Sequence, residues 1–386
     1  MISFENTENA FKAKSNSELR RSYWLFKLIG NPALVKMGAN FGPLALNLGF
    51  KGVIKSTIFK QFVGGETIHD CALTVAQLGK YNIGTILDYS VEGKESEQDF
   101  DHCLHETLET IQMAKNNTHI PFCVFKVTGL ARFELLRKVS AAESLSDAEK
   151  EEWLRVQNRV KKICHSAAEN KQPIFIDAEE SWIQPAIDQL ANDNMALCNK
   201  GRCIVYNTFQ LYRHDRLAYL QHSIEQGKTQ GYHVGAKLVR GAYMEKERER
   251  AREMNYPSPI QPTKEATDRD YDLALQVCLE NIQMMGLCAG THNENSSMKL
   301  VKLMEQHHIH STDSRIYFSQ LLGMSDHISY NLSLNGYNVS KYVPYGPVKE
   351  VLPYLIRRAQ ENTSVKGQTG RELNLIMKEK ARRAAL

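Results

Sequence analysis

Short apolar runs rich in β-branched and aromatic residues recur eight times in the chain, about thirty to fifty residues apart, with helical periodicity between them. This alternation is typical of βα units that build a parallel sheet. Eight units over about 285 residues match the size of a (β/α)8 barrel. We therefore predict an α/β fold of the (β/α)8 TIM-barrel type, with strands within residues 83–90, 121–130, 173–179, 203–210, 234–243, 287–293, 316–324 and 340–347.

The chain outside the eight units predicts two helical additions to the barrel. We expect a helical N-terminal arm over residues 1–80, the barrel over 81–365 and a helical tail over 366–386. The first residues lack a basic start followed by an apolar run, which argues against a secretory signal and indicates a cytoplasmic protein. The apolar stretch 34–62 is interrupted by glycines and lysines, so it predicts packed helices or peripheral contact with the inner membrane rather than a spanning helix.

Charge and cysteine usage exclude several classes of function. The net charge is only +4 and the basic residues do not cluster, so we expect no nucleic-acid partner. The eight cysteines are scattered without metal-ligand spacing and indicate reduced thiols. Glu179 and Glu180 lack matching histidines, so we expect no metal site.

Polar residues gather at the ends of the predicted strands. In a (β/α)8 barrel the active site lies at these carboxyl ends, so polar residues there are functional candidates. No G-x-G spacing occurs, and a P-loop at Gly227 fails because position 222 is His. Several cations among these residues indicate an anionic ligand that includes a phosphate or pyrophosphate. The candidates are Lys126, Asp177, Asn207, Gln210, Lys237, Arg240, Thr291, His292, Asn293, Gln320, Tyr342 and Tyr345.

A helix after the last predicted strand carries two adjacent arginines. Tyr354 precedes Arg357 and Arg358 by one turn, and Glu361 follows them by one turn. Pro353 should kink this helix and re-aim the pair. Two arginines about 100° apart can hold a carboxylate or phosphate between them. A surface pair tied to Glu361 is the alternative, but the position after the eighth strand favours ligand binding.

Several segments together resemble the proline dehydrogenase family in the form found in eukaryotes and some bacteria. The resemblance runs in order from about residue 80 to 365 and rests on DAEESW, YNTFQLY, KLVRGAYMEKER, THN, QLLGM, KYVPYGP and YLIRRAQEN. It implies non-covalent FAD and oxidation of L-proline to 1-pyrroline-5-carboxylate by hydride transfer to the flavin. It also implies that a quinone or another electron acceptor reoxidises the flavin, which would give the basic arm a role in membrane contact.

The resemblance also implies roles for individual residues. Lys126, Asp177, Arg357 and Arg358 would serve catalysis, with Asp177 holding Lys126 or a flavin-side arginine. The substrate would contact Lys126, Leu321, Tyr342, Tyr354, Arg357 and Arg358. FAD would contact Asn207, Gln210, Lys237, Val239, Arg240, Gly241, Ala242, Tyr243, Thr291, His292, Asn293, Gln320 and Glu361.

Other functions stay open at this point. Hydroxyproline-preferring relatives tend to carry a smaller residue where this chain has Tyr342, so proline is favoured over hydroxyproline. Lys126 could instead form a Schiff base in an aldolase or lyase. A barrel without catalytic activity, or a flavin barrel acting on another amine or a pterin, would not need the paired arginines for a carboxylate.

Overall fold

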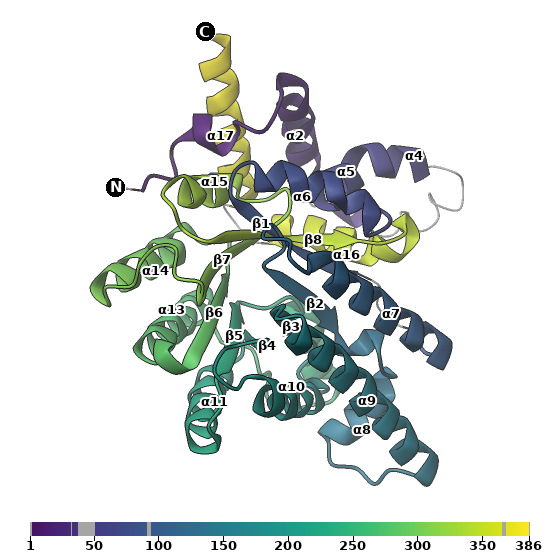
Figure 1. Ribbon diagram of the computed structural model, residues 1–386. Helices are drawn as coiled ribbons and strands as arrows, with labels where there is room; N and C mark the ends of the chain where they lie inside the picture. The colour runs from purple at the N-terminus through teal and green to yellow at the C-terminus, as the bar shows by residue number, and fades with distance from the viewer. Residues whose placement is uncertain (1, 32, 38–50, 91–93, 365–367, 386) are drawn as a thin grey trace. The chain divides into compact units, whose positions relative to one another are not determined.

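The protein contains a closed barrel of eight strands in the order β1 to β8 (Figure 1). The computed structural model describes residues 2–31, 33–37, 51–90, 94–364 and 368–385, and of these it leaves out the side chains of residues 53, 360–364, 368 and 369. All eight predicted strands are confirmed, and β1 pairs with β8 and β2 to β7 pair in sequence, all in parallel. Their bounds are Ile83–Tyr89, Phe122–Lys126, Ile174–Asp177, Val205–Gln210, Val234–Val239, Met285–Gly290, Ile316–Leu321 and Val339–Tyr345.

Helices follow most strands, as the βα pattern predicts. A capping box begins α9, where the Ser146 amide donates to Glu149 and the Glu149 amide donates to the Ser146 hydroxyl. The helices are α1 Thr7–Ala10, α2 Asn16–Ile29, α4 Lys51–Ile54, η1 Lys55–Phe59, α5 Lys60–Phe62, η2 His69–Cys71, α6 Ala72–Gly79, α7 Glu97–Ala114, η3 Val127–Gly129, α8 Phe133–Ser140, α9 Asp147–Glu169, α10 Gln184–Cys198, α11 Arg216–Gln230, α12 Met244–Glu253, α13 Lys264–Glu280, η4 Ile282–Met284, α14 Glu294–Gln306, α15 Asp326–Leu334, α16 Val348–Ser364 and α17 Gln368–Ala384.

The chain divides into two compact units. One joins Met1–Val91 to Gln320–Leu386, and the other is Glu92–Ser319. In the first unit α17 packs against α2, so the helical arm and the helical tail form one layer. These two units do not coincide with the predicted domains, whose boundaries lie at residues 80 and 365. The domain division therefore stays a prediction.

Stacked aromatic rings fill the strand layer of the unit Glu92–Ser319. The rings of Phe122 and Phe175 stack with centroids 4.4 Å apart, and Tyr206 and Tyr317 meet Phe122 edge-on. Gly286 leaves room for this cluster, because a Cβ there would lie 2.3 Å from the Tyr206 hydroxyl. The cluster defines which face of each strand points inward.

In the unit that joins Met1–Val91 to Gln320–Leu386, the arm helices pack against α16. Phe26 of α2 and Phe62 of α5 meet edge-on at 6.3 Å, and both belong to the buried cluster that contains Tyr354 and Leu355 of α16. Burial of such a cluster removes large apolar surfaces from water and holds the helices together. Within the described residues, every helix is too short or too polar to cross a membrane.

A buried ionic cluster adds polar ties in the same unit. Asp326 at the start of α15 lies 2.9 Å from both Lys14 and Lys341. Burial opposes ionisation of this carboxyl, but the two ammonium groups hold the pKa of Asp326 well below its usual range. The arm residue Lys14 is thereby tied to β8.

Candidate active site

A buried ion pair lies at the carboxyl ends of β3 and β5. The Lys237 ammonium is 2.5 Å from the Asp177 carboxylate, and their side chains are 8% and 11% exposed. The Thr208 hydroxyl donates to the same carboxylate at 3.4 Å, and the Lys237 ammonium lies 5.1 Å from the centre of the Phe175 ring. Strand register places Lys126 beside Asp177. Lys237 is therefore a partner of Asp177 that the sequence did not indicate.

Two glutamates follow β3 and have separate partners. Glu179 is buried and accepts hydrogen bonds from the Thr128 amide, at 3.0 Å, and from the Thr128 hydroxyl. Burial, with the nearby charge of Glu180, raises the pKa of Glu179 to about 8, while Thr128 and Lys126 act against the rise. Glu180 forms an ion pair with Lys246. Among the described residues, no group of three or more His, Cys, Asp or Glu side chains could hold a metal.

Gln210 links the loop after β3 to the turn after β5. Its side-chain amide donates to the Glu179 carbonyl at 2.7 Å, and its oxygen accepts from the Ala242 amide at 3.3 Å. Gly241 has a φ of 144°, and a Cβ there would lie 2.4 Å from the Tyr212 ring. Any other residue at position 241 would clash, so this turn requires glycine.

The remaining residues of the KLVRGAY turn are held by backbone bonds. Val239 ends β5 and accepts from the Leu211 amide at 2.8 Å. Tyr243 precedes α12 and accepts from the Glu247 amide at 2.9 Å. The backbone of this turn is thereby fixed at both ends.

Arg240 donates from all three of its guanidinium nitrogens to neighbouring side chains. Its partners are Asp268 at 2.7 Å, Thr291 at 2.8 Å and Ser296 at 3.0 Å. The guanidinium carbon also lies 4.4 Å from the centre of the Tyr271 ring. An anion bound by Arg240 would have to share or exchange these partners.

The THN segment after β6 begins α14. The Thr291 amide donates to the Ser319 carbonyl at 3.0 Å, and Asn293 caps the helix by accepting from the Ser296 amide at 3.1 Å. His292 lies between these two anchored residues and is half-buried. The segment therefore has a structural role as a helix start, beside any contact with a cofactor.

Two predicted cofactor residues face the helices. The Asn207 amide donates to Asp188 of α10 at 2.8 Å, and the Gln320 side-chain oxygen accepts from Ser329 of α15 at 2.8 Å. Neighbouring residues of a strand point to opposite faces, and Asn207 faces away from the side that carries Tyr206. Of Asn207 and Gln210, the geometry favours Gln210 as a flavin contact.

The predicted arginine pair lies on α16 in the other unit. This helix continues through Pro353. Tyr354 is 6% exposed and Arg358 is 8% exposed, and the Arg358 guanidinium carbon lies 5.3 Å from the centre of the Tyr354 ring. Arg357 is half-buried. The side chain of Glu361 lies outside the described residues, so its predicted contacts stay predictions.

Tyr342 and Leu321 lie at neighbouring strands of this unit. Tyr342 of β8 is 8% exposed, and its carbonyl accepts from the Leu322 amide at 2.9 Å. Its neighbour Lys341 donates toward α15, so Tyr342 points to the opposite face of β8. Leu321 ends β7 and packs against the buried cluster of the arm.

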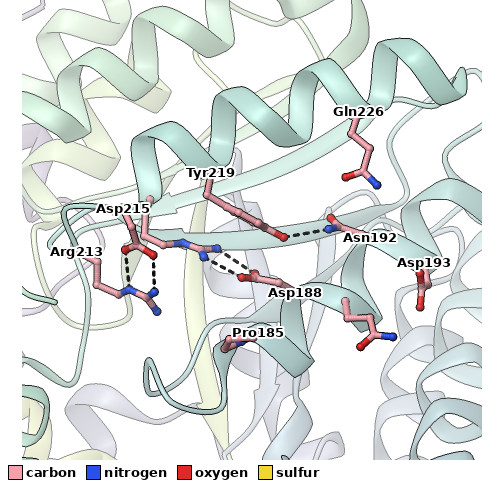
Figure 2. A pocket seen from close by; sticks show the side chains of 10 residues that line it. Pro185, Asp188, Asn192, Asp193, Arg213, Asp215, Tyr219 and Gln226 are labelled. Carbon is pink, nitrogen blue, oxygen red and sulfur yellow. Dashed lines mark hydrogen bonds and ion pairs between the residues drawn. The ribbon is translucent and has the colours of Figure 1, made fainter. Parts of the chain in front are cut away.

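A pocket of about 470 Å³ lies between α10 and α11, and none of the predicted site residues lines it. Figure 2 shows its polar lining, including Asp188, Asn192 and Tyr219. Arg216 donates to Asp188 at 2.8 and 2.9 Å. Tyr219 accepts from Asn192 at 3.0 Å. These interactions account for the polar character of the pocket, so we assign it no catalytic role.

Comparison with solved structures supports the barrel fold. The proline utilization A protein of Bdellovibrio bacteriovorus matches with a TM-score of 0.73 over 93% of this chain, at 18% sequence identity. The match covers 38% of that longer chain. At this identity the similarity shows the fold alone.

Sequence comparison identifies the family. A family model described as proline dehydrogenase matches residues 71–371. Proline dehydrogenase 1, mitochondrial, of Dictyostelium discoideum is 33% identical over 98% of this chain and 74% of its own length. Hydroxyproline dehydrogenase of Xenopus laevis is 31% identical over 97% of this chain and 88% of its own length. The chain therefore belongs to the proline dehydrogenase family of enzymes.

Proposed function

We propose that this chain is an FAD-dependent L-proline dehydrogenase that forms 1-pyrroline-5-carboxylate in the first step of proline catabolism. Beside family membership, the observation that carries the proposal is the buried Asp177–Lys237 pair at the strand ends. Such a pair keeps a positive charge in place next to a turn whose backbone can be approached closely at the exposed Ala242.

The residues of the unit Glu92–Ser319 fit a flavin. FAD, when bound, supplies the hydride acceptor. Lys237 would offer its ammonium to the polar edge of the ring, and Gln210 would orient the loop beside it. Ala242 is exposed and has no bulky side chain, while Gly241 lies against the Tyr212 ring and fixes the turn. The rest of the proposed set in this unit is Val239, Arg240, Tyr243, Thr291, His292 and Asn293, with Asn207 disfavoured by its contact with Asp188. Gln320 and Glu361, which belong to the other unit, are also proposed flavin contacts.

Substrate binding is assigned to residues of complementary chemistry. Arg357 and Arg358 would bind the carboxylate of proline, and the rings of Tyr342 and Tyr354 would cover its apolar ring. Lys126 and Leu321 complete the proposed set. Nearby cations and exclusion of water lower the pKa of a bound ammonium, so proline would lose its amine proton without a dedicated base. Positioning of this kind can contribute several kcal/mol to the reaction.

The visible spectrum of the purified protein tests cofactor, substrate and reaction together. We expect a yellow protein whose flavin absorption bleaches on anaerobic addition of L-proline. A yellow protein that does not bleach would contradict the substrate, and a colourless protein that gains no activity with added FAD would contradict the cofactor.

Hydroxyproline is the second candidate substrate, because the Xenopus relative is named a hydroxyproline dehydrogenase. The bulk of Tyr342 favours proline, since a ring hydroxyl would need space beside it. We expect kcat/KM to be higher for L-proline than for trans-4-hydroxy-L-proline, and Tyr342→Ser to narrow the difference. Trapping of a carbonyl compound on Lys126 by borohydride would instead support a Schiff-base enzyme, a function that family membership disfavours.

A quinone is the proposed electron acceptor, reached by peripheral membrane contact through α2. This helix exposes Trp24 at 59% and Leu28 at 52%, next to exposed Arg20 and Lys27. Aromatic and basic residues together suit an anionic membrane surface. Flotation with anionic liposomes should weaken in Trp24→Ser. Equal flotation of Trp24→Ser and of the control Leu73→Ser, which changes an exposed residue of α6, would reject the contact.

We propose a cytoplasmic protein with peripheral contact at the inner membrane. The Dictyostelium relative is named a mitochondrial protein. Fractionation of cells that express the protein would distinguish a membrane-bound from an unbound population.

A further inference from the structure

A second pocket of about 470 Å³ lies beside the turn after β4 and is separate from the predicted site. None of the predicted cofactor or substrate residues lines it. The turn pairs with the segment before α13, because the His214 amide donates to the Pro259 carbonyl at 3.1 Å. We call it the Arg250 pocket, and its principal residues are Trp182, Arg213, Arg250, Tyr256, Pro257 and Pro259.

Arg213 presents a buried donor at this pocket. Its Nε and one terminal nitrogen donate to Asp215 at 3.0 and 2.6 Å, as the dashed lines in Figure 2 show. The Arg213 side chain is 9% exposed, and its other terminal nitrogen, Nη1, is buried without a hydrogen-bond partner among the described residues. Burying a donor without a hydrogen-bond partner is energetically unfavourable.

Arg250 presents a second buried donor. Its guanidinium carbon lies 4.5 Å from the centre of the Trp182 ring, so the ring holds the charged group in place. The Arg250 Nε is buried and lacks a hydrogen-bond partner within the described part of the chain. No carboxylate of the described residues forms an ion pair with Arg250, whereas Arg248 on the same helix lies 3.8 Å from Glu245.

Carboxylates near the pocket are already engaged. Asp215 is bound by Arg213, and Glu247 accepts from both the amide and the hydroxyl of Ser181 at 2.6 Å. Burial raises the pKa of Glu247, although the bonds from Ser181 act against the rise. The charge of Asp215 offsets that of Arg213. Arg250 therefore keeps a positive charge that no carboxylate of the described side chains neutralises.

We infer that the Arg250 pocket binds a small oxyanion, a phosphate or carboxylate group, as a site additional to the proposed active site. Arginine forks suit both groups and supply charge-assisted hydrogen bonds. An oxyanion in the pocket would pair with the guanidinium of Arg250, which lines it and has no carboxylate partner among the described side chains. Trp182, Pro257 and Pro259 would pack against an apolar part of the same ligand, which makes an organic anion the best fit.

Isothermal titration of the full chain as purified tests the inference. The probes are inorganic phosphate, phenyl phosphate, benzoate and neutral benzyl alcohol. We expect saturable binding of phenyl phosphate, weakened at least about tenfold by Arg250→Gln because charge-assisted hydrogen bonds are lost. Arg252→Gln is the matched control, since Arg252 lies on the same helix, is exposed and, among the described residues, bonds only to the Arg248 carbonyl.

The probes also identify the source of the anion. Tighter binding of phenyl phosphate than of inorganic phosphate supports an organic anion, and equal binding supports free phosphate. Arg250→Lys keeps the charge but loses the planar fork, so it should bind with intermediate strength and covers the case in which Arg250→Gln fails to fold. Benzyl alcohol binding as tightly as phenyl phosphate, or equal binding by wild type, Arg250→Gln and Arg250→Lys, would overturn the inference. Absence of saturation in the wild type up to about 20 mM of either phosphate would also overturn it.

Discussion

The two units hold their predicted site residues by different means. In the unit Glu92–Ser319, Asp177, Lys237 and Arg240 lie on strand ends or the turns after them, in ion pairs and hydrogen bonds with neighbouring elements. In the other unit, Tyr354 and Arg358 lie on a helix that packs against the apolar cluster of the arm.

This difference teaches what each part of the proposed site depends on. Strand-end charges are fixed by the sheet and by their ionic partners, so changing one charge should destabilise its own surroundings. Residues on α16 are positioned by apolar packing of the helix against the arm. Removing their charges should therefore reduce substrate binding more than the free energy of unfolding. Four substitutions test this contrast, from the largest expected effect to the smallest.

Loss of the Asp177 charge should have the largest effect. Asp177→Asn leaves the Lys237 ammonium buried without its carboxylate, which should cost about 3–5 kcal/mol in the free energy of unfolding and reduce retained flavin. Urea denaturation measures the cost. The double variant Asp177→Asn with Lys237→Met should recover part of it, because no buried charge remains. If Asp177→Asn is as stable as the wild type, the strand-end charges do not depend on their ionic partners and the contrast between the two units is wrong.

Arg358→Met should affect activity rather than stability. Loss of charge-assisted hydrogen bonds to the carboxylate of proline should lower kcat/KM about 100-fold, equivalent to about 3 kcal/mol. The free energy of unfolding should change by less than about 1 kcal/mol, because Met retains most of the apolar contact of the side chain. Arg20→Met, an exposed change on α2, is the control. A loss confined to stability would show that Arg358 acts only as a packing residue.

The sequence predicted the barrel because strand and helix periodicities are local properties. All eight strands were located. Asn207 and Gln320 show the limit of this reasoning, since both lie on strands and yet point to helices. A shift of one residue reverses the direction of a strand side chain. Alternation with Tyr206 in the same strand is the signal that could have separated Asn207 from Gln210.

Long-range pairing could not be predicted in the same way. Lys237 and Asp177 are sixty residues apart and meet only because β3 and β5 flank β4. The grouping of α2 with α17 brings together the two ends of the chain, which no local periodicity indicates. The buried donors of Arg213 and Arg250 likewise depend on which neighbours the fold supplies.

Glu179 gives a pH-dependent test of the strand-end region. Its pKa is about 8 in the folded chain against an ordinary 4.5, so the folded state binds more protons between these values. Stability should therefore fall as pH rises from about 4.5 to about 8. Between about pH 6 and 7.5 the wild type should lose about 2 kcal/mol more than Glu179→Gln, whose side chain stays neutral. If urea denaturation shows the same loss of unfolding free energy between the two pH values for wild type and Glu179→Gln, Glu179 is already ionised in the folded chain.

The arm provides the smallest expected effect and the most direct test of how α16 is positioned. Phe26 is 1% exposed and meets Phe62 in the cluster that contains Tyr354. Phe26→Leu keeps the apolar character but loses the edge-on contact, so we expect a cost of about 1 kcal/mol in the free energy of unfolding. If packing of the arm positions α16, KM for proline should also rise about twofold while flavin content stays constant. Trp24→Leu on the exposed face of α2 should change neither value. A stability loss in Phe26→Leu with unchanged KM would mean that the arm supports the fold without orienting the arginine pair.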